Sequence, residues 1–104
     1  MDLRQVRKEY ENRGLYEDDL ASDPIDQFKI WYSEIEKVGY SEPNAMVLNT
    51  VDKNGSPSGR NVLLKEVRED GFVFFTNYES KKATDIENNK KVSLTFSWNE
   101  LRRQ

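Results

Sequence analysis

Residues 45–65, AMVLNTVDKNGSPSGRNVLLK, carry the clearest structural pattern of the chain: two apolar segments flank a turn signal. Residues 45–51 predict a strand, and the return strand is expected at about residues 58–65. Asn54-Gly55 between them is a strong hairpin signal, because these residues accept the positive φ angles of tight hairpin turns. The stretch therefore predicts an antiparallel β-hairpin.

After the hairpin, the chain carries the signals of a further strand and a short helix. A turn at Asp70-Gly71 leads to a third strand predicted at residues 72–77. Ser80 is suited to cap a helix, because its hydroxyl can accept a hydrogen bond from a free backbone N–H. We therefore expect a short helix over residues 80–88.

The plainest strand pattern lies in residues 92–98, where apolar side chains alternate with serine and threonine. This alternation is typical of a half-buried strand. Residues 45–98 should then form antiparallel strands, arranged as a meander that the short helix interrupts. The sequence ends at Gln104, so the last strand is expected to be an apolar edge of the kind that natural domains pair or cover. We interpret the chain as cut, or as completed by another chain.

Upstream of the strands, residues 23–39 predict one helix. Asp23-Pro24 is a typical helix start, an acidic cap followed by proline at the first helical position. Four side chains recur at helical spacing and are expected to form one buried face: Phe28, Trp31, Ile35 and Val38. Residues 1–22 predict a mobile arm or a short helix. The sequence thus predicts one mainly β domain with flanking helices, of the α+β class.

Composition narrows the classes of function. The 104 residues carry 16 basic and 19 acidic side chains, a net charge of −3, whereas a general nucleic-acid binder usually carries a positive field. No apolar run approaches the roughly 20 residues that cross a bilayer, and the first residues lack the apolar stretch of a secretory signal. We therefore expect no nucleic-acid or membrane partner, and a cytoplasmic location.

The chain has no cysteine and no histidine. Disulfides, thiolate metal sites, cysteine nucleophiles, zinc sites and Ser-His-Asp triads are therefore excluded within it. We expect no metal site. Any chemistry has to come from carboxylates, lysines, tyrosines or a bound cofactor, and no residue is assigned as catalytic.

Two basic clusters are candidates for binding an anion. Arg60 and Lys65 flank an apolar strand segment, but side chains five apart in a strand point to opposite faces. A shared ligand would have to wrap an edge or meet a bulge. Lys81 and Lys82 stand at the predicted helix start, where free N–H groups and the helix dipole attract phosphate, and Thr76 lies just upstream. Each cluster is equally compatible with a solvated surface.

Aromatic residues, at 12% of the chain, are candidates for stacking on a flat ring or for packing in the core. Those in the strand region are Phe72, Phe74, Phe75, Phe96 and Trp98. A further candidate is a charged segment that on composition alone is a solvated helix face: Arg7, Lys8, Glu9 and Tyr10.

Several blocks of the sequence recur, in order and with similar spacing, in one known family. They are Arg7-Lys8-Glu9-Tyr10, Asp23-Pro24, Arg60-Asn61-Val62-Leu63-Leu64-Lys65, Phe74-Phe75-Thr76-Asn77, Ser80-Lys81-Lys82-Ala83, Ile86-Glu87-Asn88-Asn89 and Arg103-Gln104. Through these blocks the chain resembles the amino-terminal half of the pyridoxamine 5'-phosphate oxidase family. The resemblance implies an antiparallel FMN-binding split β-barrel, incomplete in this chain. It also implies a homodimer with FMN at the subunit interface.

The resemblance also implies site residues, carried over position by position. Those implied to bind FMN are Arg60, Asn61, Val62, Leu63, Leu64, Lys65, Phe75, Thr76, Lys81, Lys82 and Gln104. Among them the phosphate would be held by Arg60, Lys81 and Lys82. Lys65 would reach both flavin and substrate. An arm that closes over the substrate is implied at Arg7, Lys8, Glu9 and Tyr10.

Two positions depart from the family pattern. Phe75 stands where the family commonly has tyrosine, and Lys81 stands where it commonly has arginine. Lysine keeps the charge but loses the bidentate fork, so a weaker grip on phosphate is expected. The family's late arginine-histidine element lies beyond the equivalent of Gln104.

The activity implied is FMN-dependent oxidation of pyridoxamine 5'-phosphate or pyridoxine 5'-phosphate to pyridoxal 5'-phosphate, with O2 giving H2O2, in vitamin B6 metabolism. The protein's share of such a reaction is positioning and electrostatics. Two alternatives stay open. One is another split-barrel flavin oxidoreductase, and the other is a non-catalytic flavin-binding fragment that lacks half of the substrate site.

Overall fold

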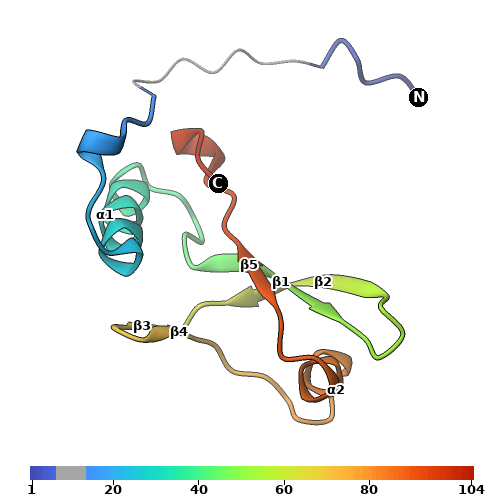
Figure 1. Ribbon diagram of the computed structural model, residues 1–104. Coiled ribbons are helices and arrows are strands. Elements are labelled where there is room, and N and C mark those ends of the chain that lie inside the picture. Colours follow the sequence, from blue (N-terminus) through green and yellow to red (C-terminus); the bar gives the residue numbers. More distant parts are fainter. Residues whose placement is uncertain (7–13) are drawn as a thin grey trace.

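The computed structural model describes residues 1–6 and 14–104. Within them the chain forms two α-helices, two short 3-10 helices and five strands (Figure 1). In chain order these are η1 (Glu17–Asp19), α1 (Pro24–Lys37), β1 (Ala45–Val51), β2 (Pro57–Leu63), β3 (Glu66–Arg68), β4 (Gly71–Val73), α2 (Lys81–Asn88), β5 (Ser93–Thr95) and η2 (Asn99–Leu101).

Helix α1 begins at the predicted cap. The Asp23 carboxylate accepts a hydrogen bond of 2.7 Å from the Ile25 N–H, and Pro24 occupies the first helical position. The buried face differs from the expected one at Val38, whose side chain is 52% exposed because it lies past the last helical residue. Tyr32 packs in its place, against the rings of Phe28 and Trp98.

The predicted hairpin is confirmed, but its loop is longer than a two-residue turn. β1 and β2 pair antiparallel from Ala45↔Leu63 to Val51↔Pro57, so residues 52–56 form the loop. The Asp52 carboxylate accepts hydrogen bonds from the N–H groups of Asn54 and Ser56, at 2.8 and 2.9 Å. Gly55 has a φ of 86°, in the region that favours glycine.

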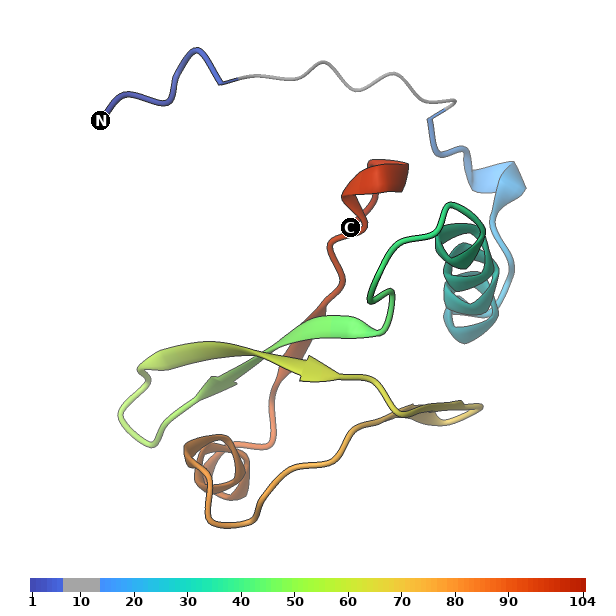
Figure 2. The same cartoon turned by 180° about the vertical axis from the view of Figure 1, so that it is seen from behind.

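The expected meander is wrong after the hairpin, because neither the third strand nor the last one pairs with β2. β5 pairs with β1, which gives a three-stranded antiparallel sheet of order β2-β1-β5, while β3 and β4 form a separate two-stranded sheet. The segment from β4 through α2 carries the chain around the sheet before β5 returns to β1 (Figure 1, Figure 2). The strands predicted at 72–77 and 92–98 are accordingly short, because a strand extends only as far as it has a hydrogen-bonded neighbour.

The apolar interior has two parts. The most buried apolar side chains are Ile35, Met46, Leu48, Leu64, Ala83 and Trp98. Beside them lies a cluster of rings that joins α1, β4 and the segment after β5, formed by Phe28, Tyr32, Phe72, Phe96 and Trp98. Phe28 is its centre, with ring centroids at 4.8 Å from Phe72 and 5.0 Å from Phe96. These aromatic residues therefore have a core role, one of the two readings that the sequence left open.

Candidate functional site

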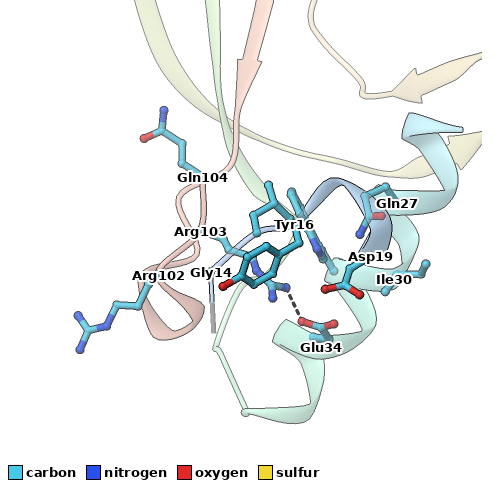
Figure 3. Close-up of a pocket in the computed structure, with 11 residues that line it drawn as sticks. Gly14, Tyr16, Asp19, Gln27, Ile30, Glu34, Arg102, Arg103 and Gln104 are labelled. Atoms are coloured by element: carbon cyan, nitrogen blue, oxygen red, sulfur yellow. Dashed lines mark hydrogen bonds and ion pairs between the residues drawn. The ribbon is translucent and has the colours of Figure 1, made fainter. Parts of the chain in front are cut away.

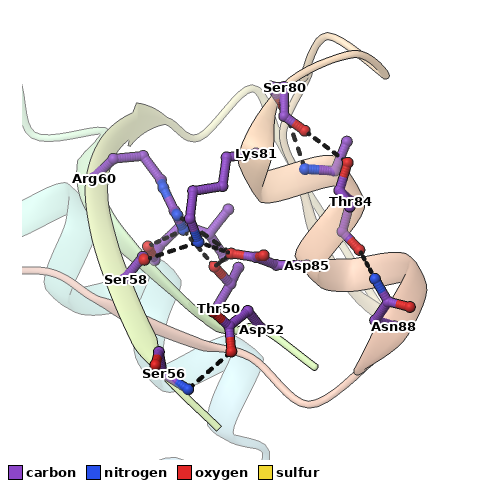
Figure 4. A network of polar contacts seen from close by, with 12 residues as sticks. Thr50, Asp52, Ser56, Ser58, Arg60, Ser80, Lys81, Thr84, Asp85 and Asn88 are labelled. Carbon is purple, nitrogen blue, oxygen red and sulfur yellow. Dashed lines mark hydrogen bonds and ion pairs between the residues drawn. The ribbon is translucent and has the colours of Figure 1, made fainter. Parts of the chain in front are cut away.

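The register of the hairpin gathers polar side chains on one face of the sheet. Thr50 lies opposite Ser58, and Leu48 lies opposite Arg60. Because directly opposed side chains point to the same face and alternate residues of a strand share a face, all four lie on one side of the sheet. Helix α2 contacts β1 on this side (Figure 4).

The Arg60 guanidinium is held along β1. It donates hydrogen bonds to the backbone oxygen of Leu48 at 3.1 Å and to Oγ1 of Thr50 at 2.8 Å. It also lies 3.8 Å from the Asp85 carboxylate of α2. Its side chain is 23% exposed, so the cation is restrained by the sheet yet still reaches solvent.

The Asp85 carboxylate is the meeting point of the site. Its Oδ2 accepts hydrogen bonds from Thr50 Oγ1 at 2.8 Å and from Lys81 Nζ at 3.0 Å. The Lys81 ammonium donates a further bond of 3.1 Å to Ser58 Oγ. The hydrogen bond from Lys81, then that from Thr50, holds the pKa of the Asp85 carboxyl below its ordinary value, because both stabilise the ionised form.

Helix α2 begins at Lys81, which is itself part of this cluster. Ser80 caps the helix as predicted, with its Oγ accepting a 3.3 Å hydrogen bond from the Ala83 N–H. The hydroxyls of Thr76 and Ser80 are 3.3 Å apart. Lys82 follows in the first turn, half-buried. Two cations, hydroxyls and a helix N-terminus together suit a phosphate group.

Lys65 lies elsewhere. Its N–H donates to the Val73 oxygen at 2.8 Å, and its side chain lines a cleft of about 390 Å³ between α1 and β3. Tyr32 and Glu36 line the same cleft, and burial, then the charge of Glu36, raises the pKa of the Tyr32 phenol. The two cations of the 60–65 segment thus belong to different parts of the surface, because Arg60 lies within β2 and Lys65 lies past its end.

The remaining residues of that segment alternate along β2 and past its end. Asn61 and Leu63 are exposed, Val62 is half-buried, and Leu64 is buried. Leu64 is fixed by Asn44, which accepts from its N–H at 2.8 Å through the backbone and donates to its oxygen at 3.1 Å through the side chain.

Gln104 lines a second cleft, of about 640 Å³, between α1 and the segment around η2 (Figure 3). Arg103 closes one wall, where its guanidinium pairs with Glu34 and lies 5.0 Å from the centre of the Trp31 ring. Phe75 does not line this cleft, and its side chain is 74% exposed. The structure thus distributes the predicted flavin-binding residues over several surfaces of the described chain.

The arm residues Arg7, Lys8, Glu9 and Tyr10 lie outside the described residues. Across the described ranges, 1–6 and 14–104, no group of three carboxylate, histidine or cysteine side chains is placed to hold a metal ion. No helix in the same ranges is long and apolar enough to cross a membrane.

Sequence reasoning missed Thr50, Ser58 and Asp85. Two signals were present. Lys81 and Asp85 are four residues apart, the spacing at which oppositely charged side chains meet on a helix. Thr50 also continues the alternation of Met46 and Leu48, which marks a hydroxyl on a buried face. The packing of helix α2 on β1 has no comparable signal in the sequence.

Comparison with known proteins gives concordant matches. The family model described as pyridoxamine 5'-phosphate oxidase matches residues 32–104. Over the whole chain, 50% of residues are identical to a pyridoxine/pyridoxamine 5'-phosphate oxidase of Vibrio parahaemolyticus, and 52% to one of Crocosphaera subtropica. The chain spans about half the length of these relatives, 49% of each.

A solved structure shares the fold. The structure of PhzG from Burkholderia lata 383, in complex with tetrahydrophenazine-1-carboxylic acid, matches with a TM-score of 0.78 and 27% sequence identity. The match covers 85% of this chain and 45% of that one. The split-barrel architecture expected from the sequence is thereby confirmed, with sheets that are not closed within the described residues.

Proposed function

Because the chain belongs to the pyridoxamine 5'-phosphate oxidase family, we propose that it binds FMN and forms part of an enzyme that oxidises pyridoxamine or pyridoxine 5'-phosphate to pyridoxal 5'-phosphate. Bound flavin would supply the chemistry, accepting hydride from the substrate and passing electrons to O2 to give H2O2. The residues of this chain would bind and orient the two rings. A cytoplasmic location completes the proposal.

The convergence of Arg60 and Lys81 carries the proposal. The two cations come from β2 and α2 and meet at one carboxylate oxygen, at 3.8 and 3.0 Å. Like charges repel, so their proximity suits a ligand that carries more negative charge than one carboxylate. We assign the FMN phosphate to this face, with Lys82 as the third cation.

We propose flavin and substrate contacts for the other residues that the sequence indicated. The ring system would lie along Asn61, Val62, Leu63, Leu64, Lys65, Phe75 and Thr76, with Gln104 as a further contact. Lys65 would face both flavin and substrate, and the arm at residues 7–10 would cover the substrate. Because these residues are spread over several surfaces, FMN at the interface of a homodimer would account for their separation.

A second candidate follows from the structural match. PhzG shares the fold at a TM-score of 0.78, and its structure contains tetrahydrophenazine-1-carboxylic acid. Another flavin oxidoreductase of the split-barrel class is therefore the alternative activity. A flavin-binding fragment without turnover is the third, since the chain spans half of its relatives. Turnover of pyridoxine 5'-phosphate by the purified chain, against a panel of other substrates, separates the three.

The phosphate assignment is tested with Lys82→Ala. Removing one charged hydrogen bond, which contributes about 1.5 kcal/mol, should weaken FMN binding about tenfold. Binding of riboflavin, which lacks the phosphate, should stay unchanged. Both affinities are measured by titration of flavin fluorescence.

Lys37→Ala is the matched control. It removes the same charge from the end of α1, away from the proposed phosphate face, and should leave both affinities unchanged. An FMN affinity for Lys82→Ala equal to that of the parent would rule out the phosphate assignment.

A further inference from the structure

We propose that Asp85 is a positioning residue, which fixes helix α2 against the sheet so that Lys81 faces Arg60 and the helix start that carries Lys82 is held beside them. The inference rests on the proposed phosphate site and extends it to a residue that would not touch the ligand's phosphate, because a carboxylate offers no donor to an anion. Asp85 would act through the cations and the helix start.

The anchor is a buried hydrogen bond between α2 and the centre of the sheet. Thr50 is fully buried and Asp85 is 3% exposed, and Thr50 Oγ1 lies 2.8 Å from Asp85 Oδ2. The other side-chain hydrogen bond between α2 and a strand within residues 14–104, from Lys81 to Ser58, is exposed. Water competes for the exposed bond much more than for the buried one.

One hydroxyl connects the helix to the arginine. A threonine hydroxyl has a single proton to donate. Because Asp85 is a carboxylate and can only accept, that proton points to Asp85, and the lone pairs of Thr50 are left for the Arg60 guanidinium at 2.8 Å. The positions of α2 and of the Arg60 head group are therefore tied through Thr50.

The buried Asp85 carboxylate is paired with two cations, Lys81 and Arg60. A buried ionised carboxylate is costly unless it is paired and hydrogen-bonded. Asp85 has Lys81 at 3.0 Å and Arg60 at 3.8 Å, one from its own helix and one from the sheet. The arrangement keeps both cations in place before any ligand arrives, which lowers the ordering cost of binding.

The test compares Asp85→Ala with Asp85→Asn. Asparagine retains an oxygen that accepts from Thr50 but loses the charge, whereas alanine loses both. We expect Asp85→Ala to lower the preference for FMN over riboflavin about tenfold, and Asp85→Asn to keep it within about threefold of the parent. Glu87→Gln is the charge control, since it removes one negative charge from an exposed position of the same helix.

A second measurement tests the Thr50–Asp85 hydrogen bond without any ligand. Hydrogen exchange of the α2 backbone amides should accelerate in Asp85→Ala and stay close to the parent rate in Asp85→Asn. An Asp85→Ala variant with the parent's flavin preference and exchange rates would overturn the inference. So would an Asp85→Asn variant whose α2 amides exchange as fast as those of Asp85→Ala, because the hydrogen bond from Thr50 would then not hold the helix.

The two proposals fail in different ways. A parent chain that binds FMN and riboflavin equally would contradict the phosphate site itself. The exchange rates of α2 would still decide whether Asp85 holds the helix.

Discussion

At the scale of single residues, the site depends on how Asp85 is solvated. Its side chain is almost completely buried, and the hydrogen bonds from Lys81 and Thr50 replace the hydrogen bonds that water would make. These bonds favour the ionised form, which is why the pKa of Asp85 falls below its ordinary value of 3.8. A lowered pKa in the folded state makes the folded state more stable wherever Asp85 is ionised.

The pH dependence of stability follows from this direction. Because the folded pKa of Asp85 is depressed, its contribution is fully present above pH 3.8 and is lost as the pH falls below that value. The parent and Asp85→Asn should therefore differ most in free energy of unfolding near neutral pH, and the difference should shrink below pH 3.8. Urea unfolding followed by tryptophan fluorescence measures both curves. A gap that widens in acid would contradict the assignment.

At the scale of elements, the β1–β2 hairpin sets the site. Its register places Arg60 opposite Leu48 and Ser58 opposite Thr50, so a slip by one residue would turn both polar side chains to the other face. The register is fixed by the loop, in which the Asp52 carboxylate accepts two backbone N–H bonds. Gly55 completes the loop with its positive φ.

Gly55→Ala should therefore lower the free energy of unfolding by about 1 kcal/mol, because an L-residue with a side chain is strained in the left-handed region. The space around the position is open, with nothing within 4 Å of an added Cβ, so the loss is conformational and not steric. Gly55→Asn is the matched control and should lose less, since asparagine tolerates this region better. Urea unfolding of the three proteins compares them; equal stability of Gly55→Ala and the parent would refute the argument.

At the scale of the whole molecule, the ring cluster holds the helix and the sheets together. Phe28 of α1 contacts Phe72 of β4 and both Phe96 and Trp98 after β5. The Trp98 indole N–H also donates to the Pro43 oxygen at 3.0 Å, which ties the end of the chain to the loop before β1. Segments far apart in sequence thus meet at one group of side chains.

Phe28→Ala should lower the free energy of unfolding by about 3 kcal/mol, at the lower end for Phe→Ala changes because the ring is only half-buried. Phe75→Ala is the comparison, since that ring is 74% exposed. It should change stability by less than about 0.5 kcal/mol in the absence of flavin. Chemical denaturation of the flavin-free proteins gives both values, and similar losses would show that the cluster is not the structural centre.

The local elements could be predicted from short stretches of the sequence. Asp23-Pro24, Asn54-Gly55 and Ser80 carry their structural signals in a few neighbouring residues, and each stands at the boundary where it was predicted. Lys81 and Lys82 were recognised as a basic pair at a helix start for the same reason. Caps and turns are satisfied by hydrogen bonds within about four residues, so short windows of sequence contain the necessary information.

Which elements meet depends on long-range packing and could not be predicted from the sequence. The pairing of β5 with β1, the separation of Arg60 from Lys65, and the contact between Thr50 and Asp85 join residues far apart in the chain or turn neighbours to different surfaces. Alternation in a strand shows that one face is buried but not which element covers it. Strand alternation and the spacing of Lys81 and Asp85 do not show that Thr50 and Asp85 meet. Their burial against each other becomes favourable only when α2 packs on β1 and brings Lys81 and Arg60 to the same carboxylate.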